Sequence, residues 1–213
     1  MSARDNILRR VRAALGPADA GRDERIAAKL SQHPRGPLPA MAWEPVGRFR
    51  QCCIGLSSTF DEVSNLAAVP AAVAQFLIAN NLPTQAICWP EFADLPWAAS
   101  ALEVQPRAAN GDDKIGITGC FCAIAETGTL MMYSGPTTSL TSSLLPDVHI
   151  ALVRRSRLVR AMEDGWDLLR REVGDMPRQV SFVSGPSRTA DIEMTMVLGI
   201  HGPYKVHVVL VND

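Results

Sequence analysis

The fold is decided by a stretch in the second half of the chain, residues 146–153, which read PDVHIALV. Five of the six residues after Asp147 are apolar, so this strand would be buried on both faces, as is typical of parallel sheets. Helical spacing of apolar residues follows over residues 156–173, and a second apolar strand over residues 179–184. A strand, a helix and another strand in this order predict an α/β domain.

Other short apolar runs extend this pattern in both directions. Residues 86–89 and 206–211 predict two more strands, the latter closing the chain. Asp61 to Asn80 predict a helix, in which Pro70 either causes a kink or marks the true first turn. We therefore expect a mostly parallel sheet with helices between its strands.

The first 39 residues differ from the rest. Apolar residues recur at helical spacing from Ile7 to Leu15, a second short helix is predicted over residues 22–30, and HPRGPLP follows at residues 33–39. Residues 1–60 carry ten basic and five acidic side chains, whereas residues 61–113 carry one and seven. The chain is thus divided into a helical arm with a proline-rich linker, residues 1–39, and an α/β domain, residues 40–213. The apolar stripe of the arm packs either on its own core or on a partner subunit.

The composition excludes several classes of function. With 21 basic and 22 acidic side chains, the chain lacks the positive charge that binding to nucleic acid or an anionic membrane surface requires. The longest uncharged apolar run, residues 63–82, contains proline, asparagine and glutamine, so no membrane span is predicted. No secretory signal is visible and the five cysteines have no zinc or cluster spacing, so we expect a cytoplasmic protein with reduced thiols. Motifs for nicotinamide, flavin or ATP are not found, and no cofactor is expected in this chain.

Three stretches are rich in glycine and small hydroxyl residues: GITGCFCAIAETGTL at 116–130, SGPSRTADIE at 184–193 and GIHGP at 199–203. In parallel sheets, ligands bind beyond the carboxyl ends of the strands, where loops offer free backbone N–H groups. The second stretch follows the predicted strand 179–184. We therefore expect a ligand to bind near it.

Together with SLLPDVHIA at residues 143–151, these stretches closely resemble the LUD-domain family, particularly its lactate-utilisation protein C branch. The resemblance covers roughly residues 114–211. It implies a fold similar to the sugar-phosphate isomerase and CoA-transferase group. It also implies a role in the oxidation of L-lactate to pyruvate beside separate iron–sulfur subunits, which would hold the clusters.

Glu126 is the only charged residue between Lys114 and Asp147. A lone carboxylate in a turn can act as a general base or as a covalent nucleophile, as in CoA transfer. It can equally fix the turn through nearby N–H groups. The neighbouring Thr127, Gly128 and Thr129 could supply donors to a carboxylate or phosphate.

A second set of candidates surrounds Arg188, because an arginine beside backbone donors suits a bidentate contact with a carboxylate or phosphate. Alternatively, Arg188 pairs with Asp191 or Glu193. The candidate ligand-binding residues of this segment are Ser184, Gly185, Ser187, Arg188, Thr189 and Asp191.

Among the histidines, His201 lies near two glycines and is a candidate for proton transfer or ligand contact. His149 is predicted to be a core residue, and His207 structural or exposed. Three functions stay open: a component of lactate utilisation, a stand-alone enzyme of the CoA-transferase or sugar-phosphate isomerase type that uses Glu126, and a non-catalytic partner-binding subunit.

Overall fold

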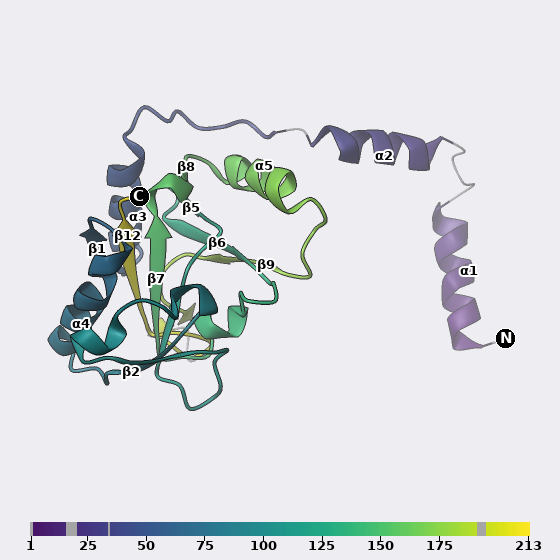
Figure 1. Cartoon of the computed structure of the whole chain (residues 1–213). Helices are drawn as coiled ribbons and strands as arrows, with labels where there is room; N and C mark the ends of the chain where they lie inside the picture. The colour runs from purple at the N-terminus through teal and green to yellow at the C-terminus, as the bar shows by residue number, and fades with distance from the viewer. Residues whose placement is uncertain (1, 16–20, 34, 191–194) are drawn as a thin grey trace. The chain divides into compact units, whose positions relative to one another are not determined.

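A computed structural model describes residues 2–15, 21–33, 35–190 and 195–213. The chain consists of two compact units, residues 1–39 and 40–213. The first unit contains helices α1 (Ala3–Leu15) and α2 (Arg22–Gln32) (Figure 1). Neither helix buries a residue within this unit. Among the residues described, no helix is both long enough and apolar enough to cross a membrane.

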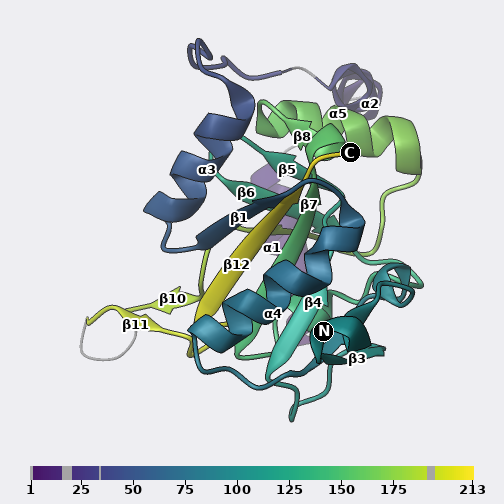
Figure 2. The ribbon, with the colours of Figure 1, turned by 60° about the vertical axis from the view of Figure 1, so that its left-hand side comes forward.

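The second unit is built around a six-stranded sheet in which all neighbouring strands are parallel, with the order β1-β12-β7-β4-β2-β3 (Figure 2). This confirms the predicted α/β class with a mostly parallel sheet. The strands are β1 (Thr59–Val63), β2 (Gln85–Cys88), β3 (Glu103–Pro106), β4 (Ile115–Thr118), β7 (Val148–Arg154) and β12 (Lys205–Val211).

Strand β7 lies near the middle of this sheet, and its first six residues are all buried. On one face, Ile150 and Leu152 belong to a core that includes Leu77 of helix α4 (Val69–Ala79). On the other face, Ala151 and Val153 belong to a core with helix α3 (Pro45–Gly55). The stretch that predicted a doubly buried strand is therefore covered on both faces.

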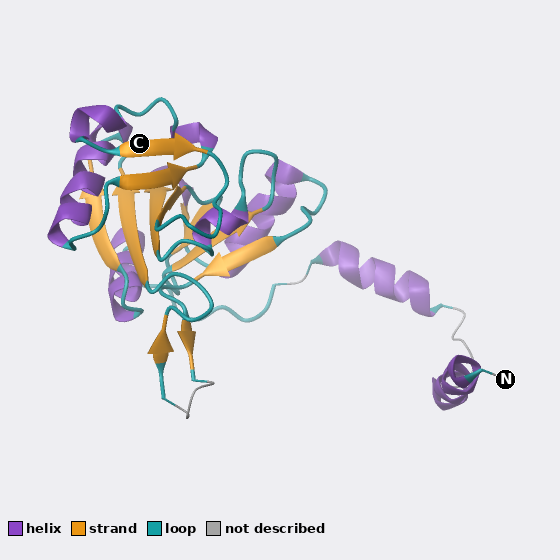
Figure 3. Ribbon diagram, turned by 90° about the horizontal axis from the view of Figure 1, so that it is seen from below, coloured by secondary structure: helices purple, strands orange, loops and turns teal. Residues whose placement is uncertain are grey.

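A second sheet, which the sequence did not predict, covers part of the α3 face. Its order is β8-β5-β6-β9, and β5, β6 and β9 are antiparallel neighbours. Helix α5 (Met162–Val173) packs on it through Leu169. The strands are β5 (Cys122–Ile124), β6 (Thr129–Tyr133), β8 (Leu158–Val159) and β9 (Val180–Val183). A separate hairpin, β10 (Arg188–Thr189) and β11 (Val197–Leu198), projects from this unit (Figure 3).

The predicted helix over residues 61–80 was wrong in its first half. Thr59–Val63 form strand β1 instead, because they pair with the closing strand β12. Asn65 then ends the strand segment by accepting a hydrogen bond from the Ala68 N–H at 3.2 Å. Pro70 lies in the first turn of α4, so it marks the true start of the helix.

One further boundary and one sheet assignment were also wrong. The predicted helix 156–173 begins only at Met162, because Arg155–Arg157 form a 3-10 turn and β8 then pairs with β5. Strand β9 pairs antiparallel with β6 in the second sheet. From the sequence, we expect a ligand near residues 184–193 because they would follow a strand of the parallel sheet. They instead follow β9, which belongs to the second sheet.

Two histidines lie inside the second unit. His149 is fully buried, as predicted, with its Nε2 2.8 Å from the Thr118 hydroxyl. His207 is 1% exposed and stacks on Phe76 at 3.9 Å between ring centroids. Burial lowers the pKa of each to about 4, so both rings are neutral at pH 7.

Gly116 of β4 lies at the closest approach between the sheet and the 3-10 turn Leu140–Ser143. A Cβ atom added at Gly116 would lie 2.1 Å from the backbone oxygen of Ser142 and 2.9 Å from Pro146 Cγ. The Ser142 oxygen belongs to the backbone, so it could make room for a Cβ atom only if the Leu140–Ser143 turn were displaced. The sequence GITG thus requires its first glycine for packing.

Gly116→Ala should lower the free energy of unfolding by about 1–3 kcal/mol or more, because the added methyl group overpacks the core. Urea denaturation at pH 7 measures the change. Gly55→Ala is the matched control, since nothing lies within 4 Å of a Cβ there. Equal stability of the two variants would contradict the proposed packing role of Gly116.

Candidate functional site

The residues predicted from the glycine-rich stretches gather around the carboxyl end of α3. Gly128 has φ 68°, and a Cβ there would lie 2.7 Å from Cys52 Cβ. Gly185 has φ 80°, and a Cβ there would lie 2.5 Å from the Leu56 oxygen. Both glycines therefore combine a left-handed backbone with close packing on α3 and the residue after it.

Three of the candidate hydroxyl residues form a continuous chain. Thr129 Oγ1, on a side chain that is almost fully buried, lies 2.7 Å from Thr127 Oγ1 and 2.7 Å from Ser184 Oγ. Thr127 and Ser184 are exposed. The structure thus brings together two loops, the Glu126–Thr129 turn and the segment that begins at Ser184, each of which the sequence offered as a candidate for ligand binding.

Glu126 is held in this region by its backbone. Its carbonyl accepts hydrogen bonds from Arg48 Nη2 at 3.1 Å and from Cys52 Sγ at 3.4 Å, and its N–H donates to the Arg160 carbonyl at 3.0 Å. The side chain is half-buried. These contacts fix the turn, and the catalytic role of Glu126 stays a prediction.

Arg188 contacts the end of α3 through its side chain. Its Nη2 donates to the Leu56 carbonyl at 2.8 Å and to the Ser57 hydroxyl at 2.7 Å. The alternative partners Asp191 and Glu193 lie outside the described residues. The guanidinium therefore fastens strand β10 to the segment that follows α3.

The remaining candidates lie close by in the chain. The Ser187 N–H donates to the Pro203 carbonyl at 2.9 Å, and the Gly199 N–H donates to the Ser187 carbonyl at 3.0 Å. Thr189 is buried, whereas His201 is exposed. The SGPS and GIHGP stretches are thus joined by backbone hydrogen bonds.

A different pocket, with a volume of about 210 Å³, lies at the carboxyl edge of the parallel sheet. All strands of this sheet run in one direction, so residues that follow β1, β2, β4 and β7 meet there. After β2, the next strand of this sheet is β3, on one side; after β4, the next strand is β7, on the other side. The strand order therefore changes direction between β2 and β4, and α/β proteins bind ligands at such a topological switch point. The lining residues are Leu66, Trp89, Glu91, Phe92, Gly119, Cys120, Phe121, Tyr133, Thr138, Leu152, Arg154, Arg157 and Val211.

Charged groups of both signs line this edge pocket. Arg154 is the last residue of β7 and Arg157 follows three residues later. Glu91 carries the opposite charge. Its carboxyl lies close to the backbone of Gly119, where an added Cβ atom would be 2.7 Å from Glu91 Oε1. Although part of the Glu91 side chain is exposed, loss of water around the carboxyl raises its pKa, and Arg154 opposes this shift.

The sequence reasoning missed this pocket because it searched for glycine-rich stretches. Trp89 ends the predicted strand 86–89, and Arg154 follows the predicted strand 148–153. Polar or aromatic residues directly after parallel strands are the signal that could have found the site. Only Gly119 and its two neighbours in the pocket belong to a stretch that had been singled out.

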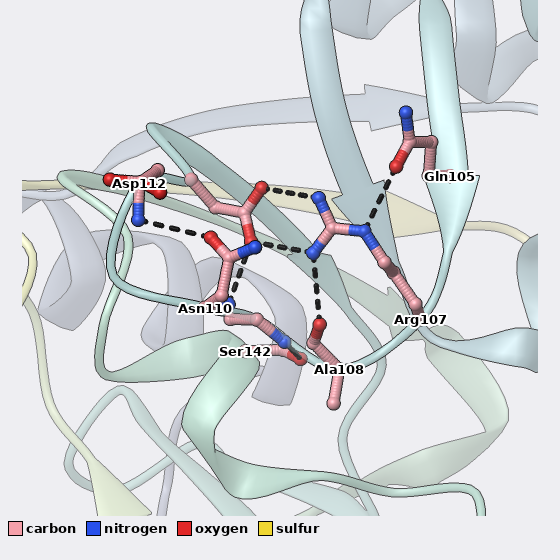
Figure 4. Close-up of polar contacts among 8 residues, drawn as sticks. Gln105, Arg107, Ala108, Asn110, Asp112 and Ser142 are labelled. Carbon is pink, nitrogen blue, oxygen red and sulfur yellow. Dashed lines mark hydrogen bonds and ion pairs between the residues drawn. The ribbon is translucent and has the colours of Figure 1, made fainter.

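A cluster of polar groups around Arg107 and Asp113 lies in the loop before β4 (Figure 4). Arg107 forms a bidentate ion pair with Asp113 at 2.7 Å for both bonds and also donates to Gln105 and Ala108. The Arg107 guanidinium lowers the pKa of Asp113. Because these groups satisfy one another, we assign the cluster a structural role in the loop before β4.

The cysteines are free thiols. Burial raises the pKa of Cys53 and Cys122 to about 12, and that of Cys120 also lies above its ordinary value. Over the residues described, no group of three or more histidine, cysteine or acidic side chains is placed to hold a metal ion.

Comparison with known proteins gives the family. The chain matches the LUD domain over residues 55–211, which includes every strand of both sheets. The chain belongs to the LUD-domain family. Its LUD domain resembles the crystal structure of a DUF162 family protein from Deinococcus radiodurans, with a TM-score of 0.60, 23% identity and coverage of 81% of this chain and 99% of that one.

Several curated relatives carry the name lactate utilization protein C. The protein from an Exiguobacterium species is 42% identical over 120 residues, covering 55% of this chain and 52% of the relative. That from Bacillus subtilis is 33% identical over 129 residues, covering 59% and 54%, and that from Deinococcus radiodurans is 29% identical over 184 residues, covering 83% and 84%. The matches to the first two span about half the length of those relatives.

Arg188→Gln should lower the free energy of unfolding of the LUD domain by about 1 kcal/mol, because the hydrogen bonds to Leu56 and Ser57 are lost from an exposed group. Urea denaturation measures this, with the exposed Arg178→Gln as control. A different result would support a ligand contact: unchanged stability together with a ten- to hundredfold loss of pyruvate or phosphate affinity.

Proposed function

We propose that this protein acts in L-lactate utilisation, the conversion of L-lactate to pyruvate, in the cytoplasm. The observation that carries the proposal is the family match across the whole of both sheets, shared with relatives named lactate utilization protein C. Its fold supports this role by placing a pocket with two arginines at the edge of the sheet where α/β proteins bind small molecules.

In this proposal the protein contributes no redox group and works with separate iron–sulfur subunits that carry the electrons. The chain lacks a four-cysteine cluster motif, and its two closest cysteine pairs, Cys52 with Cys53 and Cys120 with Cys122, have spacings that do not suit a cluster. Electron transfer would then take place on the partners. This chain would bind a small molecule or position the partners.

Deletion of the gene from its own organism should abolish growth on L-lactate and leave growth on pyruvate unchanged, because pyruvate enters metabolism after the proposed step. Growth curves on each carbon source measure the effect, and re-expression of the full chain is the control. Normal growth of the deletion strain on L-lactate, in an organism without a second copy of the gene, would refute the proposed function.

The helical arm is proposed to bind the iron–sulfur partners. Neither helix buries a residue within the first unit, and their apolar side chains include Ile7, Leu15 and Leu30. A helix of 13 residues is only marginally stable in water without packing. Contact of the apolar stripe with a partner would provide that packing.

Removal of residues 1–39 should therefore abolish co-purification with the iron–sulfur subunits. The melting temperature of residues 40–213 is expected to stay close to that of the full chain, since these residues form a compact unit by themselves. The full chain is the control. Recovery of the same partners at the same yield by the truncated protein would show that the arm is not the docking element.

A further inference from the structure

The edge pocket combines two cations with an apolar interior. Its floor and walls include Leu66, Leu152 and Val211, and Phe121 and Tyr133 contact each other edge to face at 5.3 Å. A hollow lined by cationic groups and apolar side chains suits a small organic anion, whose charged end meets the cations while its carbon atoms contact apolar side chains.

Arg157 is held in place before any ligand arrives. Its Nη1 donates to both carboxylate oxygens of Glu172, at 3.0 and 2.8 Å, and its guanidinium lies 5.3 Å from the centre of the Phe121 ring. These hydrogen bonds use one of its three nitrogens. The planar group is thus oriented, with further N–H donors for a bidentate contact.

Arg154 has the less compensated charge of the two. In the described part of the chain its acidic ion-pair partner is Asp213, which lies 3.9 Å away, beyond hydrogen-bond distance. Both oxygens of Asp213 already accept hydrogen bonds from Ser156, at 2.9 Å from the N–H and 2.6 Å from the hydroxyl. Asp213 therefore compensates the charge of Arg154 only weakly, and this charge can attract an anion in the pocket.

Glu91 completes the polar part of the pocket. The titratable groups that line the pocket with it come from three other segments: Arg154 and Arg157 at and after the end of β7, Cys120 after β4, and Tyr133 at the end of β6. Cys120 is a neutral thiol because burial raises its pKa, so it adds no negative charge. The carboxyl of Glu91 is the only acidic side chain among the lining residues.

We propose that the edge pocket binds a small carboxylate on Arg154 and Arg157, and that Glu91 takes up a proton from solvent when the carboxylate binds. No covalent bond changes; one anion and one proton enter together. The inference rests on the proposed function only in its choice of ligand, since L-lactate and pyruvate are both small carboxylates.

The proton uptake follows from electrostatics. The pKa of Glu91 is already raised in the free protein, and a second negative charge nearby raises it further. The complex therefore binds more protons than the free protein at pH values between the two pKa values of Glu91. Affinity should rise as the pH falls through this window, by up to about tenfold per pH unit.

Isothermal titration of the full-length protein with L-lactate and with pyruvate, between pH 5 and pH 8, tests the proposal. Arg154→Gln should weaken binding by about ten- to hundredfold, as expected for loss of a charge-assisted contact. Arg171→Gln, an exposed arginine of α5 outside the pocket, is the matched control and should bind like wild type. Glu91→Gln should bind at pH 8 at least as tightly as wild type and should lose the pH dependence of affinity and the proton uptake.

Four results would overturn the proposal. They are absence of binding by the wild type, unchanged affinity of Arg154→Gln, undiminished proton uptake by Glu91→Gln, and equal affinity for inorganic phosphate, which would indicate an oxyanion site without preference for carboxylates. Melting temperatures of all variants identify any that fail to fold, and Arg154→Lys then serves as the second variant, with an intermediate loss expected. A growth defect of the deletion strain without carboxylate binding would refute this pocket alone, whereas binding without a growth defect would refute the proposed function alone.

Discussion

Burial of strand β7 on both faces is the constraint on which the second unit depends. Its alternate residues enter two cores, one with α4 and one with α3 and the second sheet. Backbone groups in the middle of such a sheet are used up by hydrogen bonds between strands, so free polar groups occur only where strands end. Polar side chains are therefore concentrated at the sheet edges, and a functional pocket can form there without disturbing the core.

The edge pocket shows how parallel strands bring distant residues together. Glu91 and Cys120 follow two strands and Arg154 ends a third, and they meet because those strands run in one direction. The position of Glu91 also depends on Gly119, since any larger residue would occupy the space of its carboxyl. The chemical character of the pocket thus comes from strand order together with one backbone position.

The glycine-rich motifs have a packing role that their composition did not reveal. Gly128 and Gly185 have positive φ angles and lie against α3, and Arg188 bonds to the residues that follow that helix. In the same region, the hydroxyl of Thr129 lies within hydrogen-bond distance of those of Thr127 and Ser184. Small residues that could admit a ligand therefore also admit a helix, and only the binding of a ligand distinguishes these roles.

The sequence by itself determined the α/β class, the strands at 148–153 and 206–211, and the family, because these rest on local apolar runs and on motifs. It misread residues 61–63 as helix, since their strand conformation comes from pairing with β12, about 150 residues away. It also missed the second sheet, whose short strands have little periodicity of their own. The placement of Glu91, Arg154 and Arg157 around one pocket was decided only by the tertiary structure, because it follows from the order of strands in the sheet and no local pattern records that order.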